Sequence, residues 1–93
     1  MSLSAKQAVR LAKAWLEDQF SDEQIENLGL EEVRLNGDAW EITLGFSRAW
    51  EARDIPYSAI TGITGVIKPR TYKVVVVDDN SEHVVQMRNR EAA

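Results

Sequence analysis

The sequence contains no cysteine, one histidine, two prolines and five glycines among its 93 residues. The absence of cysteine excludes disulfide bonds, thiolate catalysis and zinc or iron–sulfur sites built on thiolates. A single histidine excludes metal sites built from several histidines. Low glycine and proline contents exclude collagen-like and low-complexity chains. We therefore expect a folded domain that holds neither a metal nor another cofactor.

Long apolar runs and excess positive charge are also missing. The longest unbroken apolar run is Val74–Val77, whereas a membrane-spanning helix needs about 20 such residues. Eleven basic and fifteen acidic side chains give a net charge of −4, the wrong sign for a general nucleic-acid binder. We expect a cytoplasmic protein that binds neither membranes nor nucleic acids. An extracytoplasmic location is the alternative if a leader precedes the printed sequence.

The composition, 44% hydrophobic and 28% charged, is typical of a globular protein, and the length predicts a single domain over 1–93. Ser4 followed by Gln7 is a capping-box pattern that begins a helix. Apolar residues then recur at a helical period as far as Phe20, which predicts an amphipathic helix. Ser21 with Gln24 repeats the cap pattern, so residues 21–29 are predicted to form a brief second helix or a turn.

From Leu30 onward the apolar period changes to two, which predicts strands. The pair Asn36-Gly37 favours a hairpin turn between them. If Leu35 and Asp38 flank this turn, Val33 lies opposite Trp40 and both side chains face the helix. The sequence therefore predicts a first hairpin that runs from residue 30 to about residue 47.

A second hairpin is predicted from Thr71–Val77, an acidic turn at 78–82 and a returning strand at 83–90. The alternation within 71–77 would place apolar side chains on both faces, which favours a central position for this strand. The predicted fold is α+β: an N-terminal amphipathic helix packed on a four-stranded antiparallel sheet made of two hairpins. A long connection, residues 48–70, joins strands two and three.

The 48–70 connection is rich in apolar side chains and is our predicted contact surface for a protein or peptide. Large aromatic side chains such as Trp50 and Tyr57 often contribute most of the binding energy of an interface. Two alternatives remain open: these residues cover the sheet or complete its core, or they form a homodimer. The predicted partner-binding residues are Trp50, Ile55, Tyr57, Ile60 and Ile63.

The antiparallel order would bring several arginines to one end of the sheet, where they could bind a carboxylate or phosphate. The alternative is that nearby glutamates and aspartates, Glu31, Glu32, Glu51 and Asp54, pair with these arginines, which then add little beyond solubility. The predicted anion-binding residues are Arg48, Arg53, Arg70 and Arg88.

Catalytic chemistry finds little support in the sequence. The acidic turn 78–82 has neither the glycine nor the distal glutamate of a calcium loop, so a solvated hairpin turn is the favoured interpretation. No spacing pairs His83 with a serine. The carboxylates of Glu31 and Glu32 would point to opposite faces of a strand, which argues against joint acid–base work. We therefore predict a protein that is not an enzyme.

The string from Arg70 to Val85, RTYKVVVVDDNSEHVV, follows an N-terminal amphipathic helix and resembles the closing hairpin of PepSY-like domains. Those domains are small helix-on-sheet modules. The resemblance implies a non-catalytic regulatory or protease-inhibitory role, often outside the cytoplasm. The leading function hypothesis is an interaction module that binds a protein or peptide through 48–70. Binding of a small anion at the arginine-rich end of the sheet is the alternative, together with the PepSY-like role.

Overall fold

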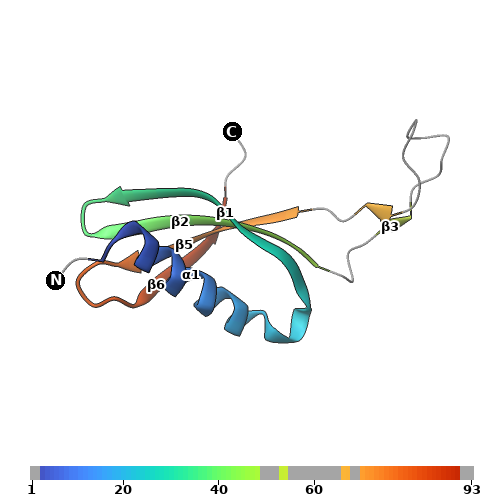
Figure 1. Cartoon of the computed structure of the whole chain (residues 1–93), viewed down its shortest axis with the longest axis horizontal. Helices are drawn as coiled ribbons and strands as arrows, with labels where there is room; N and C mark the ends of the chain where they lie inside the picture. The colour runs from blue at the N-terminus through green and yellow to red at the C-terminus, as the bar shows by residue number, and fades with distance from the viewer. Residues whose placement is uncertain (1–2, 49–52, 55–65, 68–69, 91–93) are drawn as a thin grey trace.

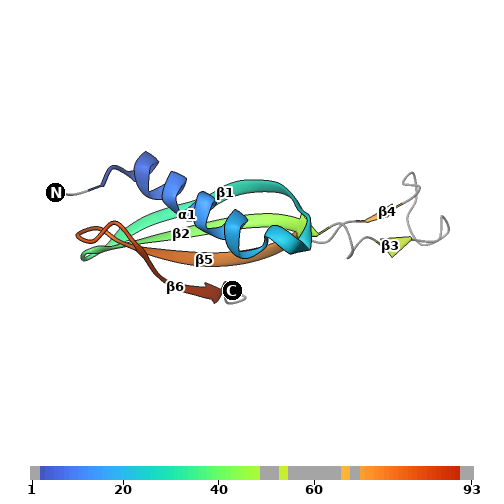
Figure 2. The same ribbon diagram turned by 90° about the horizontal axis from the view of Figure 1, so that it is seen from below.

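A computed structural model describes residues 3–48, 53–54, 66–67 and 70–90, and it confirms the predicted fold class. One helix lies across one face of a four-stranded antiparallel sheet with the strand order β1-β2-β5-β6 (Figures 1 and 2). The elements are α1 (Ala5–Gln19), the 3-10 turn η1 (Ser21–Glu23), β1 (Ile25–Asn36), β2 (Ala39–Arg48), β3 (Arg53–Asp54), β4 (Val66–Ile67), β5 (Arg70–Asp78) and β6 (Val84–Asn89).

The predicted capping box is confirmed at the start of α1. The Gln7 backbone N–H donates to the Ser4 hydroxyl at 3.1 Å, and the Ser4 backbone N–H donates to Gln7 Oε1 at 2.8 Å. These two bonds satisfy donors that a helix start otherwise leaves without partners. The helix ends at Gln19, and the N–H of Phe20 donates to the carbonyl of Leu16. The bonds that cap the start of the helix are therefore local to residues 4–7.

The segment after α1 differs from the prediction. Only three residues, Ser21–Glu23, form a 3-10 turn, and Gln24 then takes a left-handed conformation with φ of +50°. This residue redirects the chain, and β1 begins at Ile25, five residues before the predicted start at Leu30. Of the two predicted alternatives, a brief helix or a turn, the structure has the turn, limited to Ser21–Glu23, and the residues from Ile25 onward belong to the sheet.

Two irregularities in β1 explain why the strand period was hidden in the sequence. The pairing of β1 with β2 shifts between Glu26 and Gly29, and again between Leu30 and Glu32. Asn27, inside the first irregularity, has φ of +56°. Each bulge inserts an extra residue and interrupts the alternation of side chains. The apolar residues of this stretch therefore do not recur at every second position, although they lie in one strand.

The hairpin turn between β1 and β2 lies at Gly37 and Asp38, one residue later than predicted. Gly37 has φ of +64°, which suits the first central position of a type II′ turn. Leu35, rather than Val33, therefore lies opposite Trp40. The observed pairing of β1 with β2 therefore differs from the predicted pairing by two residues. Because side chains alternate between the faces with a period of two, every side chain stays on its predicted face. Val33 and Trp40 both pack against the core, as predicted.

The core lies between α1 and the sheet. The central position predicted for the strand at residues 71–77 is confirmed, because this strand, β5, pairs with β2 on one side and with β6 on the other. Val74–Val77 are all buried, as the unbroken apolar run suggested. The core residues are Leu3, Ala8, Ala12, Leu16, Ile42, Leu44, Phe46, Val75 and Val77.

The connection between β2 and β5 contains a small antiparallel ribbon of β3 and β4, in which Arg53 lies opposite Ile67. The predicted partner-binding residues all lie outside the described residues: Trp50, Ile55, Tyr57, Ile60 and Ile63. In the part of the chain that the structure describes, no helix is long and apolar enough to cross a membrane.

Candidate functional site on the open face of the sheet

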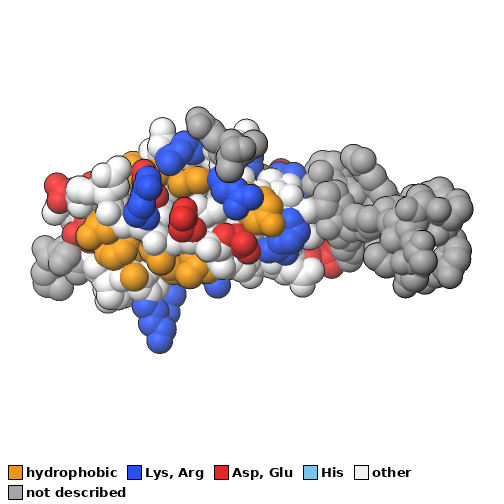
Figure 3. Space-filling model, turned by 90° about the horizontal axis from the view of Figure 1, so that it is seen from above, with side chains coloured by type: hydrophobic (Ala, Val, Ile, Leu, Met, Phe, Trp, Pro, Cys, Tyr) orange, Lys and Arg blue, Asp and Glu red, His pale blue; other side chains and the backbone are white. Residues whose placement is uncertain are grey.

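The side of the sheet opposite α1, which we call the open face, is covered by no helix among the described residues (Figure 2). Side chains of β2 alternate between the two sides. Ile42 points toward the helix and is buried in the core, whereas Glu41 and Thr43 belong to the open face. Figure 3 views the molecule from this side and shows basic, acidic and apolar side chains interspersed over the sheet. The open face is therefore a mixed surface and not an apolar one.

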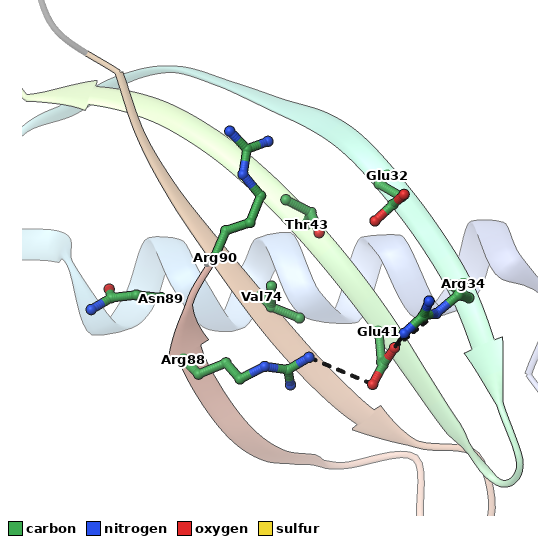
Figure 4. A pocket seen from close by; sticks show the side chains of 8 residues that line it. All are labelled: Glu32, Arg34, Glu41, Thr43, Val74, Arg88, Asn89 and Arg90. Carbon is green, nitrogen blue, oxygen red and sulfur yellow. Dashed lines mark hydrogen bonds and ion pairs between the residues drawn. The ribbon is translucent and has the colours of Figure 1, made fainter. Parts of the chain in front are cut away.

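A pocket of about 280 Å³ lies on the open face. Its floor is formed by Thr43 and Val74, which are only 3% and 6% exposed. Charged side chains from the outer strands form its walls (Figure 4). The long methylene stems of arginines can shield such a floor from water while the charged ends stay hydrated. The residues that line the pocket are Glu32, Arg34, Glu41, Thr43, Val74, Arg88, Asn89 and Arg90.

Glu41 is the centre of an ionic network at one end of the pocket. Arg34 donates to Glu41 Oε1 from Nε at 3.0 Å and from Nη2 at 2.7 Å. Arg88 Nη2 lies 3.6 Å from Glu41 Oε2 on the other side. The hydrogen bond from Arg34 lowers the pKa of Glu41 against the opposing effect of burial, and the same bond raises the pKa of Arg34. Glu41 is therefore an ionised carboxylate that holds two arginines in place.

The opposite end of the pocket depends on a glycine. Gly45 lies directly opposite Tyr72 in the β2–β5 pair. A Cβ atom at Gly45 would be 2.8 Å from Tyr72 Cε1 and 2.9 Å from Arg70 Nη2, closer than side chains normally approach. The missing side chain lets the Tyr72 ring lie across β2. The Arg90 guanidinium stacks on that ring, 3.9 Å from its centroid.

The predicted anion-binding arginines are divided between the two sides of the sheet. Arg88 lines the pocket, and Arg70 reaches β1, where its Nη1 donates to the Asn27 carbonyl at 3.0 Å. Arg70 Nη2 also lies 4.0 Å from Glu31 Oε2, a pairing that the sequence had offered as the alternative. Arg70 and Arg88 therefore share a face, but they do not converge at one end of the sheet as predicted, because Arg70 lies opposite Ser47 whereas Arg88 lies opposite Val74. Both have acidic neighbours.

Arg48 is not part of this group, because its side chain lies on the α1 side. It stacks against the rings of Phe20 and Phe46, 5.4 Å and 5.2 Å from their centroids, and its Nε is 3.1 Å from Glu23 Oε1. The antiparallel order places Arg48 at the expected end of the sheet, but the alternation along β2 directs it to the opposite face. The side chain of Arg53 lies outside the described residues.

Sequence reasoning missed Arg34 and Glu41, which are paired directly across β1 and β2. Opposite charges at facing positions of two strands are a recognisable signal. The signal was hidden because a turn at Asn36-Gly37 pairs different residues. With the turn at Gly37 and Asp38, the two residues face each other.

The carboxylates of the acidic turn after β5 accept hydrogen bonds from the protein itself. Asp79 Oδ1 accepts hydrogen bonds from the backbone N–H of Leu3 at 2.7 Å and from Trp40 Nε1 at 2.9 Å. Asp78 Oδ2 accepts from the Ser81 N–H at 2.7 Å, and this bond lowers the pKa of Asp78. Within the described ranges, no group of three or more His, Cys, Asp or Glu side chains could hold a metal ion. These carboxylates organise the turn and the N-terminus.

No protein-family model, curated protein or solved structure matches this chain. The open face and its pocket are therefore the basis on which a function can be inferred.

Proposed function

We propose that this protein is a non-catalytic interaction module that binds a protein or peptide on the open face of its sheet. The observation that supports this proposal is the pocket over Thr43 and Val74, whose charged walls are positioned by defined contacts. Antiparallel sheets often leave one face in water. Here that face also offers a concave site with directional hydrogen-bond donors and acceptors, as a specific binding surface requires.

The chemistry of the pocket favours binding over catalysis. A general acid or base works best when its pKa lies near the working pH. The pKa of Glu41 is lowered by Arg34, which keeps this carboxylate ionised and engaged with its neighbours. Arginine stays protonated under ordinary conditions and serves as a hydrogen-bond donor, not as a base. The arrangement is therefore better suited to hold a charged partner than to transfer protons.

The test is selection of binding peptides from a random library on the intact domain, followed by mapping of the contact by amide chemical shifts. We expect the largest shifts on β2, β5 and β6, at the open face. Arg88→Glu should weaken binding, because Arg88 is exposed and lines the pocket. Arg10→Glu is the matched control, since Arg10 is exposed on α1. Shifts confined to the α1 side would contradict the assignment of the open face.

The 48–70 connection is the second proposed contact region within the same function. Replacing Trp50 and Tyr57 together by alanine should weaken the selected peptides while leaving the circular dichroism spectrum unchanged. If this variant binds normally and Arg88→Glu does not, the contact lies on the open face alone. If only the aromatic pair matters, the connection is the binding surface and the open face is not.

Binding of a small anion is a second candidate function, supported by the three arginines of the pocket, Arg34, Arg88 and Arg90. A thermal-shift series with acetate and phosphate tests it, since a ligand that binds only the folded state raises the melting temperature. No shift at millimolar concentrations would count against it.

The resemblance to PepSY-like domains supports a regulatory or protease-inhibitory form of the proposed function. Inhibition assays against a panel of purified proteases test that form, and full protease activity at excess domain would contradict it. A homodimer is the remaining form of protein binding. Light scattering over a concentration series tests it, and a constant monomer mass would contradict it.

A further inference from the structure

Two charged side chains of the pocket are not part of the Glu41 network. Glu32 and Arg90 lie on opposite walls, with Thr43 between them (Figure 4). Arg90 stacks on Tyr72, and no carboxylate among the described residues pairs with its guanidinium. Glu32 influences Arg34 through its charge alone, and in the described part of the chain it has no ion pair within 4.0 Å. Both side chains are on exposed residues.

The placement of these two groups limits the charge of a suitable ligand. An anion near Arg90 would also experience repulsion from Glu32 and Glu41. A cation near Glu32 would experience repulsion from three arginines. A ligand that carries both charges avoids these conflicts, because its carboxylate can meet Arg90 while its cationic group meets Glu32. The positions of the charges therefore favour a bipolar ligand over a singly charged one.

We propose that the pocket recognises an acidic and a basic side chain presented together by an extended partner segment, the acidic one against Arg90 and the basic one against Glu32. This inference rests on the proposed binding of a protein or peptide to the open face. In an extended segment, side chains two residues apart project to the same side, about 7 Å from each other. Their methylene stems would cover Val74 and Thr43, the apolar part of the floor.

A peptide segment suits the site better than a free small molecule. Small-molecule pockets are usually enclosed and measure about 300–1,000 Å³, whereas this one is smaller, about 280 Å³, and lies on the face of a sheet. Side chains attached to a longer segment can use a shallow site, because the neighbouring residues supply further contacts. Exposed ion pairs change affinity by only about two- to fivefold each and weaken with salt. Recognition should therefore be strongest at low ionic strength.

The experiment measures binding of acetyl-Thr-Glu-Thr-Lys-Thr-amide to the intact domain by amide chemical shifts at low salt. Three matched peptides carry Gln in place of Glu, in place of Lys, or in place of both. We expect the parent peptide to bind about two- to fivefold more tightly than either singly substituted peptide. The largest shifts should lie around Thr43, Val74 and Arg88.

Variants of the protein test which pocket residue meets the Glu and which meets the Lys of the peptide. In Arg90→Gln, replacing the Glu of the peptide should no longer matter, while replacing its Lys still weakens binding. In Glu32→Gln the pattern should be reversed. Arg10→Gln, on the exposed side of α1, should behave as the unmodified protein. Each variant should keep the amide spectrum of a folded domain, because both pocket residues are exposed.

Four results would overturn the inference. Equal binding of the parent and the doubly substituted peptide at the open face would leave the proposed function intact and remove the bipolar recognition. Binding that depends on Glu but not on Lys would mean a simple anion site. Tight binding of free 4-aminobutyrate, with none of the peptide, would mean a small-molecule site. If no test peptide shifts the open face while library-selected peptides do, the partner chemistry is wrong and the binding surface stands.

Discussion

Replacing Asp79 by alanine should destabilise the domain, because one carboxylate oxygen joins three parts of the chain. Asp79 Oδ1 accepts from the Leu3 N–H at 2.7 Å and from Trp40 Nε1 at 2.9 Å. The backbone N–H of Asp79 donates to the Asp38 carbonyl at 2.8 Å, a bond that alanine retains. The substitution therefore removes the two contacts that tie the N-terminus and β2 to the turn after β5.

The size of the effect follows from the two lost hydrogen bonds. A hydrogen bond to a charged group contributes about 1.5–3 kcal/mol when buried. Here one oxygen accepts both bonds in a partly buried site, so we expect a total loss of about 2–3 kcal/mol. Small proteins have urea m-values of about 1 kcal/mol/M, so the urea midpoint, followed by circular dichroism, should fall by roughly 2–3 M.

A double-mutant cycle with Trp40→Phe isolates the indole bond. Because both substitutions remove that same bond, the double variant should lose about 1 kcal/mol less than the sum of the single losses. Asn80→Ala is the matched control, an exposed position in the same turn, and should change stability by no more than about 0.5 kcal/mol. An Asp79→Ala midpoint equal to that of the control, or a strictly additive cycle, would refute the role assigned to this carboxylate.

Three further predictions concern the pocket, the first turn and the core. Arg34→Gln should raise the pKa of Glu41 toward its ordinary value, measured by carboxyl NMR titration. Because the pKa of Glu41 is lowered in the folded state, the stability that Glu41 contributes is present above its unfolded pKa and is lost as the pH falls through its folded pKa. Arg34→Gln should weaken this loss of stability in acid. An unchanged titration of Glu41 would contradict the Arg34 bond. Gly37→Ala should cost about 1–2 kcal/mol in urea denaturation, because φ is +64° there and left-handed backbone is unfavourable for alanine. Gly29→Ala, with only ordinary contacts at 3.9 Å and 4.0 Å, is its control, and equal losses would contradict the turn assignment. Leu16→Ala should cost about 2–5 kcal/mol in thermal or urea unfolding, because its side chain is fully buried in the core; a loss below about 1 kcal/mol would be inconsistent with that packing.

Local features of the sequence determined several elements correctly. The capping residues Ser4 and Gln7 mark the start of α1, since the bonds involved span only three residues. The run Val74–Val77 indicates a strand that is covered on both faces or lies centrally, and the structure bears out the central position of β5. These predictions succeed because a short segment contains all the information they need.

The first hairpin shows where local information is insufficient. Asn36-Gly37 and Gly37-Asp38 are both acceptable turn pairs, and either keeps the apolar residues on the helix side. In the structure the turn is Gly37-Asp38, and β1, with its two bulges, pairs with β2 in the register that this turn gives. The same register places Arg34 opposite Glu41. A difference of one residue in the turn therefore decides whether the charge pair of the pocket exists.

The sequence by itself determined the fold class, the helix, the two hairpins and the central strand, because periodicity, capping and turn chemistry act over a few residues. The site was decided only in the tertiary structure. Arg48 and Arg88 were predicted to meet at one end of the sheet, yet strand alternation directs Arg48 to the rings of Phe20 and Phe46, and the cross-strand register places Arg88 level with Thr43, beside Glu41. Side-chain direction depends on cross-strand register, and register is set by pairings between residues far apart in the chain.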